Sequence, residues 1–406
     1  MSHDFRSGKC IKCGNSKEAA EYFGFTCSAD KKSKPWENSM ETNITTIVLG
    51  PSGSGKTVFM ASMYTYLLDS FTKNGFCFQA SDETDKKFRD IHHELSSGKD
   101  WPPPTAGGQE YSFDLRAYSE GITKDVSRVK YWDYTGQWII GGTDTDSSFK
   151  TALRNSNILL CLLDGRSIVN EIKTGKSEIA KTISALSARA QDTSNIAPLQ
   201  FIVTKWDHVL ENKITLSQVS ELLKKQPAWA NLMRLCQDRK SNARLIPVSS
   251  VGEKFCKWNG HEFEIIPHSV PTPINLHLPF CFAFTQLLQS KLENAGKMKQ
   301  QASAKSRSPK WWEYLLDLVD DVLDKLDDII PGPPIAKPVV KKIIKIIAGE
   351  GAKSRAEMDR EFQEIKDGEL ANADQETRFY ASLIYNLSLS AKEFEEMHPE
   401  AILKYE

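Results

Sequence analysis

Features that would assign the chain to a membrane, secreted or nucleic-acid-binding class are missing from its 406 residues. No apolar run approaches the roughly 18 residues that a bilayer-spanning helix needs. The beginning of the sequence, MSHDFRSGKC, has no apolar stretch after its charges and so lacks the pattern of a secretory signal. Neither sign of charge is in excess, because 52 Lys and Arg residues oppose 53 Asp and Glu residues. We therefore expect a cytoplasmic protein with no general attraction to nucleic acid or anionic lipid.

Internal repeats, a His-Glu-x-x-His motif and a convincing nucleophilic triad are also absent from the sequence. Its composition is ordinary for a globular protein, with 40% hydrophobic and 26% charged residues, which is enough apolar material to bury a core. At roughly 150 residues per domain, the length suggests two or three domains. The eight Cys residues are expected to be reduced in a cytoplasmic setting.

Short apolar runs alternate with amphipathic segments between residues 41 and 296. The runs predict strands at 42–49, 111–118, 126–132, 158–163, 200–204 and 244–249, and the amphipathic segments predict helices near 60–71, 177–189, 216–224 and 280–292. Such alternation is typical of a mainly parallel sheet with helices on both faces, which makes an α/β three-layer sandwich.

A phosphate-binding motif follows the first predicted strand. The motif G-x-x-x-x-G-K-[ST] is matched in full by Gly50, Pro51, Ser52, Gly53, Ser54, Gly55, Lys56 and Thr57. Glycines let the backbone wrap closely and point its N–H groups at phosphate oxygens, and the helix that follows favours an anion at its N-terminus. Lys56 should reach the β- and γ-phosphates, and the Thr57 hydroxyl should bind Mg²⁺. The fold expected is therefore that of a P-loop NTPase.

A second phosphate-side segment, YWDYTGQ, stands at the end of the strand predicted at 126–132. Asp133 can hold Mg²⁺ through water at that position. The backbone N–H of Gly136 can approach the γ-phosphate, and Gln137 can orient an attacking water molecule. The Asp-x-x-Gly pattern is weak alone, but its place at a strand end downstream of a phosphate loop makes it informative.

Two further strand ends carry groups suited to a guanine base. The strand at 200–204 ends in Thr204-Lys205-Trp206-Asp207, where the Asp207 carboxylate can accept both N–H groups of guanine's Watson–Crick edge. Adenine offers an acceptor there, and such paired polar groups discriminate by roughly 10⁴-fold or more. The stem of Lys205 can lie over the base. The next strand ends at Ser249, and the backbone N–H of Ser250 can meet the guanine O6 atom.

Together these segments resemble the five sequence motifs of Ras-like (TRAFAC-class) GTPases over about residues 43–295. The resemblance implies GTP and GDP as ligands with Mg²⁺ as cofactor. The residues that it places at the nucleotide are Gly50, Ser52, Gly53, Ser54, Gly55, Lys56, Thr57, Asp133, Gly136, Thr204, Lys205, Asp207, Ser249 and Ser250. It implies catalytic roles for Lys56, for Gln137 and for a switch I threonine that also binds Mg²⁺. Thr105, in WPPPTAGG, is the best candidate for that threonine.

The sequence departs from the Ras-like pattern in three places. Thr204 replaces the commoner Asn, which weakens one contact with the phosphate loop. Ser52 stands where Gly is frequent and narrows the access of an arginine finger. Thr105 lies unusually far from Lys56, so residues 72–100 are expected to form an inserted strand and helix. This insertion and the WPPPT sequence are similar to bacterial double-GTPase proteins, which usually sit beside partner proteins.

The leading hypothesis is a molecular switch that binds and hydrolyses GTP and acts on a protein partner. The alternatives are a GTP-binding scaffold with little hydrolysis and, against the evidence of Asp207, an ATP-driven P-loop NTPase. Arg154 and Arg166 are open candidates for an arginine finger within the chain, although each also suits an ordinary surface residue. A finger adds about 10³–10⁵ in rate, so the isolated chain is expected to turn over slowly.

The segments that flank residues 41–296 give less definite predictions. In residues 1–40, Cys10, Cys13 and Cys27 form part of a zinc-ribbon pattern, with His3 as a possible fourth ligand; zinc and free thiols both remain open. Residues 297–310 have the composition of a linker, and 311–406 are expected to be helical. Within that region, 339–348 is basic and amphipathic, and it is expected either to pack on the Asp-rich helix at 311–330 or to contact a membrane weakly.

Overall fold

The computed structural model describes the chain in twelve segments. These are residues 5–6, 9–10, 43–98, 101–103, 109–119, 121–133, 147–191, 199–238, 243–284, 355–368, 370–371 and 375–403. The chain divides into two units, residues 1–42 and residues 43–406. In the first unit the described residues form an antiparallel pair, β1 (Phe5–Arg6) and β2 (Lys9–Cys10). All the other described elements belong to the second unit.

A seven-stranded sheet with the order β4-β5-β6-β3-β7-β8-β9 forms the centre of the second unit. Its strands are β3 (Asn43–Leu49), β4 (Phe76–Ala80), β5 (Gln109–Ser119), β6 (Ile122–Asp133), β7 (Ile158–Asp164), β8 (Leu199–Thr204) and β9 (Arg244–Pro247). From β6 to β9 all neighbours are parallel, and β5 is antiparallel to both β4 and β6. The predicted α/β class with a mainly parallel sheet is therefore confirmed.

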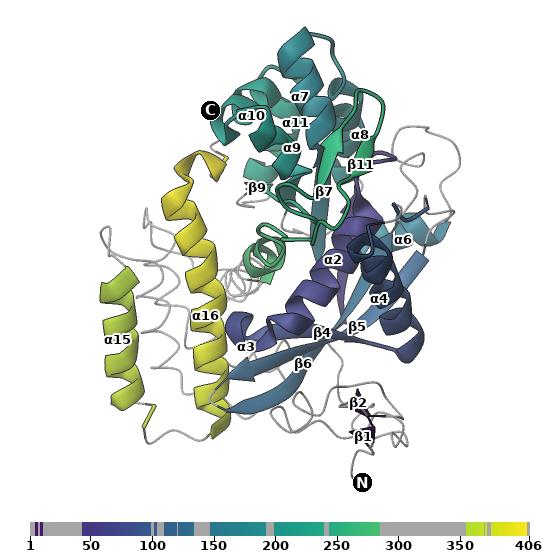
Figure 1. Ribbon diagram of the computed structural model, residues 1–406. Coiled ribbons are helices and arrows are strands. Elements are labelled where there is room, and N and C mark those ends of the chain that lie inside the picture. The colour runs from purple at the N-terminus through teal and green to yellow at the C-terminus, as the bar shows by residue number, and fades with distance from the viewer. Residues whose placement is uncertain are drawn as a thin grey trace, which may run out of the picture. The chain divides into compact units, whose positions relative to one another are not determined.

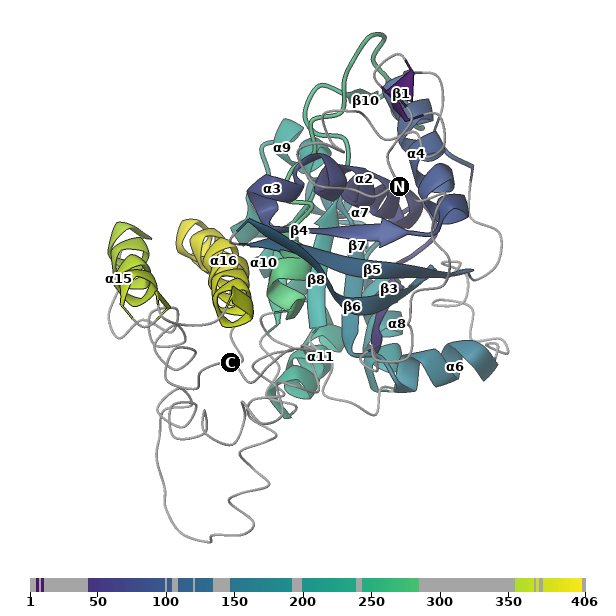
Figure 2. The same cartoon turned by 90° about the horizontal axis from the view of Figure 1, so that it is seen from below.

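The burial of the strands explains their sequence patterns. Every residue of β7 and β8 is buried, so these strands consist of continuous apolar runs. Helices cover both faces there: α2 (Lys56–Asp69) lies on one face, and α8 (Ala180–Gln191) and α11 (Pro227–Asp238) lie on the other (Figure 2). By contrast, β5 alternates between buried and more exposed residues, which is the pattern of a strand with one covered face.

The insertion expected at 72–100 contains a strand and a helix, as predicted. The strand is β4, which pairs with β5 at the edge of the sheet, and the helix is α4 (Asp82–Ser96), which packs against α2 (Figure 1). Ser81 caps α4 by accepting the N–H of Thr84 at 3.4 Å, and acidic residues in the first turn suit the helix dipole. Phe88 anchors the helix, with its ring centroid 5.5 Å from that of Tyr64 on α2.

Several short elements were not expected from the sequence. They are α3 (Phe71–Asn74), α6 (Ser147–Arg154), α7 (Gly165–Thr174), α9 (Trp206–Glu211), α11, and the hairpin of β10 (Cys256–Trp258) and β11 (Phe263–Ile265). The helix predicted at 216–224 is present as α10 (Leu216–Lys224), which begins with a capping box of Thr215 and Gln218.

The helical C-terminal region is present in the described residues. It consists of α15 (Arg355–Asp367), α16 (Gln375–Met397) and the 3₁₀ turn η3 (Pro399–Ala401) (Figure 1). The rings of Phe362 on α15 and Tyr385 on α16 stack with their centroids 3.9 Å apart. The chain then returns to the sheet, where Ile402 makes an antiparallel bridge with Arg244 of β9. The predicted linker at 297–310, the helix at 311–330 and the basic segment at 339–348 lie outside the described residues.

Of the helices that the structure describes, not one combines the length and the apolar character needed to cross a bilayer.

Candidate functional site

The phosphate loop connects the end of β3 to the start of α2. Gly53 and Gly55 adopt left-handed backbone angles, with φ of 75° and 86°, which side chains rarely tolerate. Gly50 is required for a different reason, because a Cβ atom there would lie 2.7 Å from Ser54 Oγ and 2.9 Å from Leu162 Cβ. The three glycines thus allow a tight turn whose N–H groups precede a helix N-terminus.

Lys56, the first residue of α2, folds back over this loop. Its ammonium Nζ donates to the carbonyl oxygens of Gly50 at 2.9 Å and Pro51 at 3.0 Å. The side chain is buried, and this burial lowers the pKa of Lys56, while the nearby Asp133 carboxylate opposes the shift. A partly desolvated cation therefore stands against the first residues of the loop, where an anionic ligand would gain most from it.

Thr57 and Asp133 come together at the same edge of the sheet. In the parallel pairing of β3 and β6, Val48 lies opposite Asp133, so the first turn of α2 and the end of β6 are neighbours. The Thr57 hydroxyl donates to Asp133 Oδ2 at 3.3 Å. A hydroxyl and a carboxylate are the oxygen ligands that Mg²⁺ accepts while keeping most of its waters. The residues present therefore fit the predicted magnesium site.

The Thr204-Lys205 turn after β8 is hydrogen-bonded to the phosphate loop. The Thr204 hydroxyl lies 2.9 Å from the carbonyl oxygen of Ser54, so threonine at this position keeps a contact with the loop. Lys205 has a left-handed φ of 53°, and its Nζ donates to the carbonyl oxygen of Gly53 at 2.7 Å. The same ammonium pairs with Asp164 Oδ1 at 2.7 Å. The two sequence motifs, about 150 residues apart, thus form one continuous site.

Asp207 lies in the first turn of α9, beside the end of β9. Its Oδ1 accepts a hydrogen bond from Ser249 Oγ at 2.5 Å, and its Oδ2 lies 4.0 Å from Cys256 Sγ. Burial raises the pKa of Asp207, while the hydrogen bond from Ser249 acts in the opposite direction. Ser249 is fully buried, and Ser250, which follows it, is partly buried. The predicted base-recognition residues therefore meet in space.

Some predicted site residues lie outside the described residues. They are Thr105, Gly136 and Gln137 of the two switch segments, and Cys13, Cys27 and His3 of the proposed zinc site. Cys10 lies on β2. Within the described part of the chain, no group of three or more His, Cys, Asp or Glu residues is placed to hold a metal ion.

Two residues of the site were missed by the sequence interpretation. Asp164 ends β7 and pairs with Lys205, and Gly165 starts α7 in close contact with the Thr204 carbonyl. Both residues follow the buried run 158–163, at the carboxyl end of a parallel strand. Ligands bind at this end of such sheets, so the position of the two residues in the sequence could have identified them as site residues. Arg166 is held at the base side of the site, with Cζ 5.5 Å from the Trp258 ring centroid.

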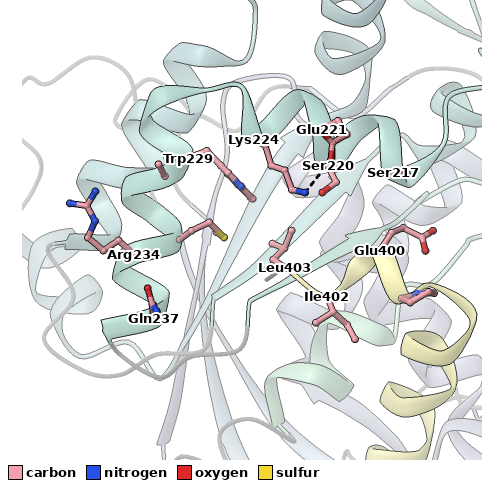
Figure 3. Close-up of a pocket in the computed structure, with 13 residues that line it drawn as sticks. Ser217, Ser220, Glu221, Lys224, Trp229, Arg234, Gln237, Glu400, Ile402 and Leu403 are labelled. Atoms are coloured by element: carbon pink, nitrogen blue, oxygen red, sulfur yellow. Dashed lines mark hydrogen bonds and ion pairs between the residues drawn. The ribbon is translucent and has the colours of Figure 1, made fainter. Parts of the chain in front are cut away.

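A separate cavity of about 480 Å³ lies between α10, α11 and the C-terminal residues (Figure 3). Its walls include Lys224, Trp229, Arg234 and Glu400. None of the residues that line it belongs to the phosphate loop or to the base-recognition turns. We therefore do not assign this cavity as the nucleotide site, although it is large enough to hold a ligand.

Comparison with protein families agrees with the geometry. A family model described as Double-GTPase 2 matches residues 46–254, just over half of the chain. The chain belongs to the Double-GTPase 2 family. Its membership confirms the resemblance to P-loop GTPases of the double-GTPase type and supports the binding and hydrolysis of GTP. No curated protein matches the chain.

The double-GTPase match contains the phosphate loop, Asp133, the Thr204–Asp207 turn and Ser249, whereas Cys256, whose Sγ lies 4.0 Å from Asp207 Oδ2, falls outside it. The hairpin β10–β11 and the C-terminal helices lie beyond the matched residues.

Proposed function

We propose that this double-GTPase protein is a molecular switch that binds GTP, hydrolyses it slowly and signals to a protein partner through its switch segments. One observation supports the proposal most: Lys205, two residues from Asp207, donates to the phosphate loop at Gly53, 2.7 Å away. A single nucleotide can therefore place its base at Asp207 and its phosphates on the loop.

Recognition of the base depends on Asp207. Its carboxylate accepts the two N–H groups of guanine and meets the lone pair of adenine unfavourably, so the site favours guanine. The hydrogen bond from Ser249 at 2.5 Å fixes the orientation of the carboxylate before the ligand arrives. The apolar stem of Lys205 covers one face of the base while its ammonium remains bound to Gly53 and Asp164.

The phosphate side is organised by Lys56, Thr57 and the loop N–H groups. Thr57 and Asp133 would hold Mg²⁺, which supplies neutralising charge at the β- and γ-phosphates when it is bound. Lys56 neutralises the same oxygens from within the loop, and the N–H groups of the loop stabilise charge that develops on the leaving phosphate.

Hydrolysis requires a positioned water molecule as well. By resemblance to the Ras-like family, Gln137 orients that water and Thr105 closes on the γ-phosphate. Arg166 is paired with Asp164 at 3.5 Å and with Trp258, so it is occupied on the base side. We infer that a partner completes the site, as an arginine finger contributes about 10³–10⁵ in rate.

Base specificity is tested by nucleotide competition on the wild type and on Asp207→Asn. The wild type should prefer GTP to ATP strongly, and the variant should lose GTP and gain xanthosine triphosphate, whose edge suits an amide. Asp238→Asn, an exposed change on α11, is the control and should behave as the wild type. ATP competing as well as GTP on the wild type would show that the specificity is wrongly assigned.

The hydrolytic role is tested by multiple-turnover phosphate release. Slow release that depends on Mg²⁺ is expected for the switch, and release at the level of the uncatalysed reaction would favour a GTP-binding scaffold instead. Ser52 is exposed on the phosphate loop, where its side chain would narrow the access of an arginine finger to the phosphates. This observation supports the alternative of a GTP-binding scaffold with little hydrolysis. Fast hydrolysis by the isolated chain would contradict the need for a partner.

A further inference from the structure

Both carboxylate oxygens of Asp207 contact the segment that follows β9. Oδ1 accepts from Ser249 Oγ at 2.5 Å, and Ser249 Oγ in turn accepts the backbone N–H of Gly252 at 2.7 Å. Oδ2 lies 4.0 Å from Cys256 Sγ, on the first residue of β10. The orientation of Asp207 is therefore determined by where residues 249–256 lie.

Residues 249–256 pack against the inserted segment that was expected at 72–100. Leu95 of α4 forms an apolar cluster with Val251 and Phe255, and Trp101 packs against it. We call these four residues the base-loop cluster. Leu95 and Phe255 are fully buried and Val251 is 5% exposed, so this contact is a small core and not a surface touch.

Trp101 also holds the hairpin β10–β11. Its indole Nε1 donates to the carbonyl oxygen of Phe263 at 2.6 Å, and its ring centroid lies 6.1 Å from that of Phe255 in an edge-on arrangement. Phe263 of β11 pairs with Trp258 of β10, and Cys256 pairs with Ile265. The Trp101 side chain thus contacts both the other residues of the base-loop cluster and the strand pair that carries Cys256.

From these contacts we propose that α4 of the inserted segment and Trp101, which follows that segment, position Asp207 for guanine recognition, with Trp101 as the positioning residue. The inference rests on the proposed function. Trp101 touches no reacting group and acts through Phe255, Phe263 and the turn at Ser249. A carboxylate that is already held in one orientation loses little conformational entropy when it binds the guanine edge. Loosening the base-loop cluster would remove this preorganisation and weaken guanine binding.

The experiment compares the affinity for GDP with that for inosine diphosphate, whose base lacks the exocyclic amine that would donate a hydrogen bond to Asp207. Affinities are measured by fluorescent-nucleotide competition for Trp101→Phe, which removes the indole donor and keeps a ring, and for Trp101→Ala, which removes both. Trp229→Phe is the matched control, because Trp229 is 3% exposed and packs on Phe201 at 4.6 Å on the other face of the sheet.

A hydrogen bond of this kind changes an equilibrium by about fivefold. We expect Trp101→Ala to lower the affinity for GDP about tenfold and the affinity for inosine diphosphate less than threefold. The ratio of the two affinities should therefore fall at least threefold. Trp101→Phe should lie between Trp101→Ala and the wild type, and Trp229→Phe should leave the ratio unchanged. A general loss of structure would weaken both ligands equally and keep the ratio.

The inference is overturned if Trp101→Ala is folded and its affinity ratio stays within twofold of the wild type, or if both affinities fall together. Should Trp101→Ala fail to fold, an unchanged ratio in Trp101→Phe overturns it equally. Failure of the wild type to bind GDP is a different result, since it rejects the proposed function and not the role of Trp101.

Discussion

Gly165 offers a direct test of how the base turn is attached to the phosphate loop. A Cβ atom at Gly165 would lie 2.2 Å from the carbonyl oxygen of Thr204 and 3.1 Å from that of Lys205, whereas real Cβ atoms essentially never approach within 3.0 Å. Gly165→Ala must therefore increase the separation between the start of α7 and this turn by about 0.8 Å, the difference between 2.2 Å and 3.0 Å. Both carbonyls belong to backbone, so no flexible side chain can absorb the change.

The expected magnitude follows from the two hydrogen bonds that this turn makes. Thr204 reaches the Ser54 carbonyl at 2.9 Å, and Lys205 reaches the Gly53 carbonyl at 2.7 Å. A neutral hydrogen bond contributes about 1 kcal/mol and one to a charged group about 1.5–3 kcal/mol. Loss of both would weaken nucleotide binding by about 100-fold, and loss of one by about tenfold. We therefore expect Gly165→Ala to bind GDP at least tenfold more weakly than the wild type.

Gly175→Ala, at the other end of α7, is the matched control. Gly175 has a φ of 71° and nothing within 4 Å of an added Cβ, so its substitution costs about 1 kcal/mol of stability through backbone strain alone. Both variants should lower the melting temperature, but only Gly165→Ala should weaken GDP in a fluorescence titration. Equal GDP affinity in the two variants would refute the argument.

Two further predictions concern the metal and the pH. Thr57→Ala should abolish the tightening of nucleotide binding by Mg²⁺, measured in a magnesium titration, whereas Thr65→Ala on the same helix should not, because the Thr65 hydroxyl only bonds back to Ala61 at 3.0 Å. Burial raises the pKa of Asp207 in the folded protein above its value in the unfolded chain. Above the folded-state pKa the buried, ionised carboxylate lowers the free energy of unfolding, and below the unfolded-state pKa this destabilisation is absent. Ligand-free Asp207→Asn should therefore melt at a higher temperature than the wild type at neutral pH and lose this advantage as the pH falls through the two pKa values; a constant difference would contradict it.

The sequence was sufficient where structure and chemistry depend on neighbouring residues. The phosphate loop, the continuous apolar strands and the helix at 216–224 follow from local pattern, because side-chain period and backbone freedom are properties of adjacent residues. The inserted strand and helix were predictable for a related reason, since the distance from Lys56 to Thr105 left room for both. Short elements such as α9 and the hairpin β10–β11 were missed, because contacts with distant segments stabilise them and their own propensity does not.

The roles of Thr105, Gly136, Gln137 and the N-terminal cysteines remain predictions from the sequence alone, as do the partner and the membrane contact at 339–348.

By itself, the sequence predicted that a glycine loop with Lys56 would bind phosphate and that Asp207 would suit guanine, because each prediction depends on residue type at fixed spacing. Only the tertiary structure decided that Lys205 bonds to Gly53, that Asp164 pairs with it, and that Trp101 packs behind the base-recognition turn. These contacts join residues far apart in the chain, and their partners are chosen by strand order and by the packing of the inserted helix. No local pattern encodes that choice.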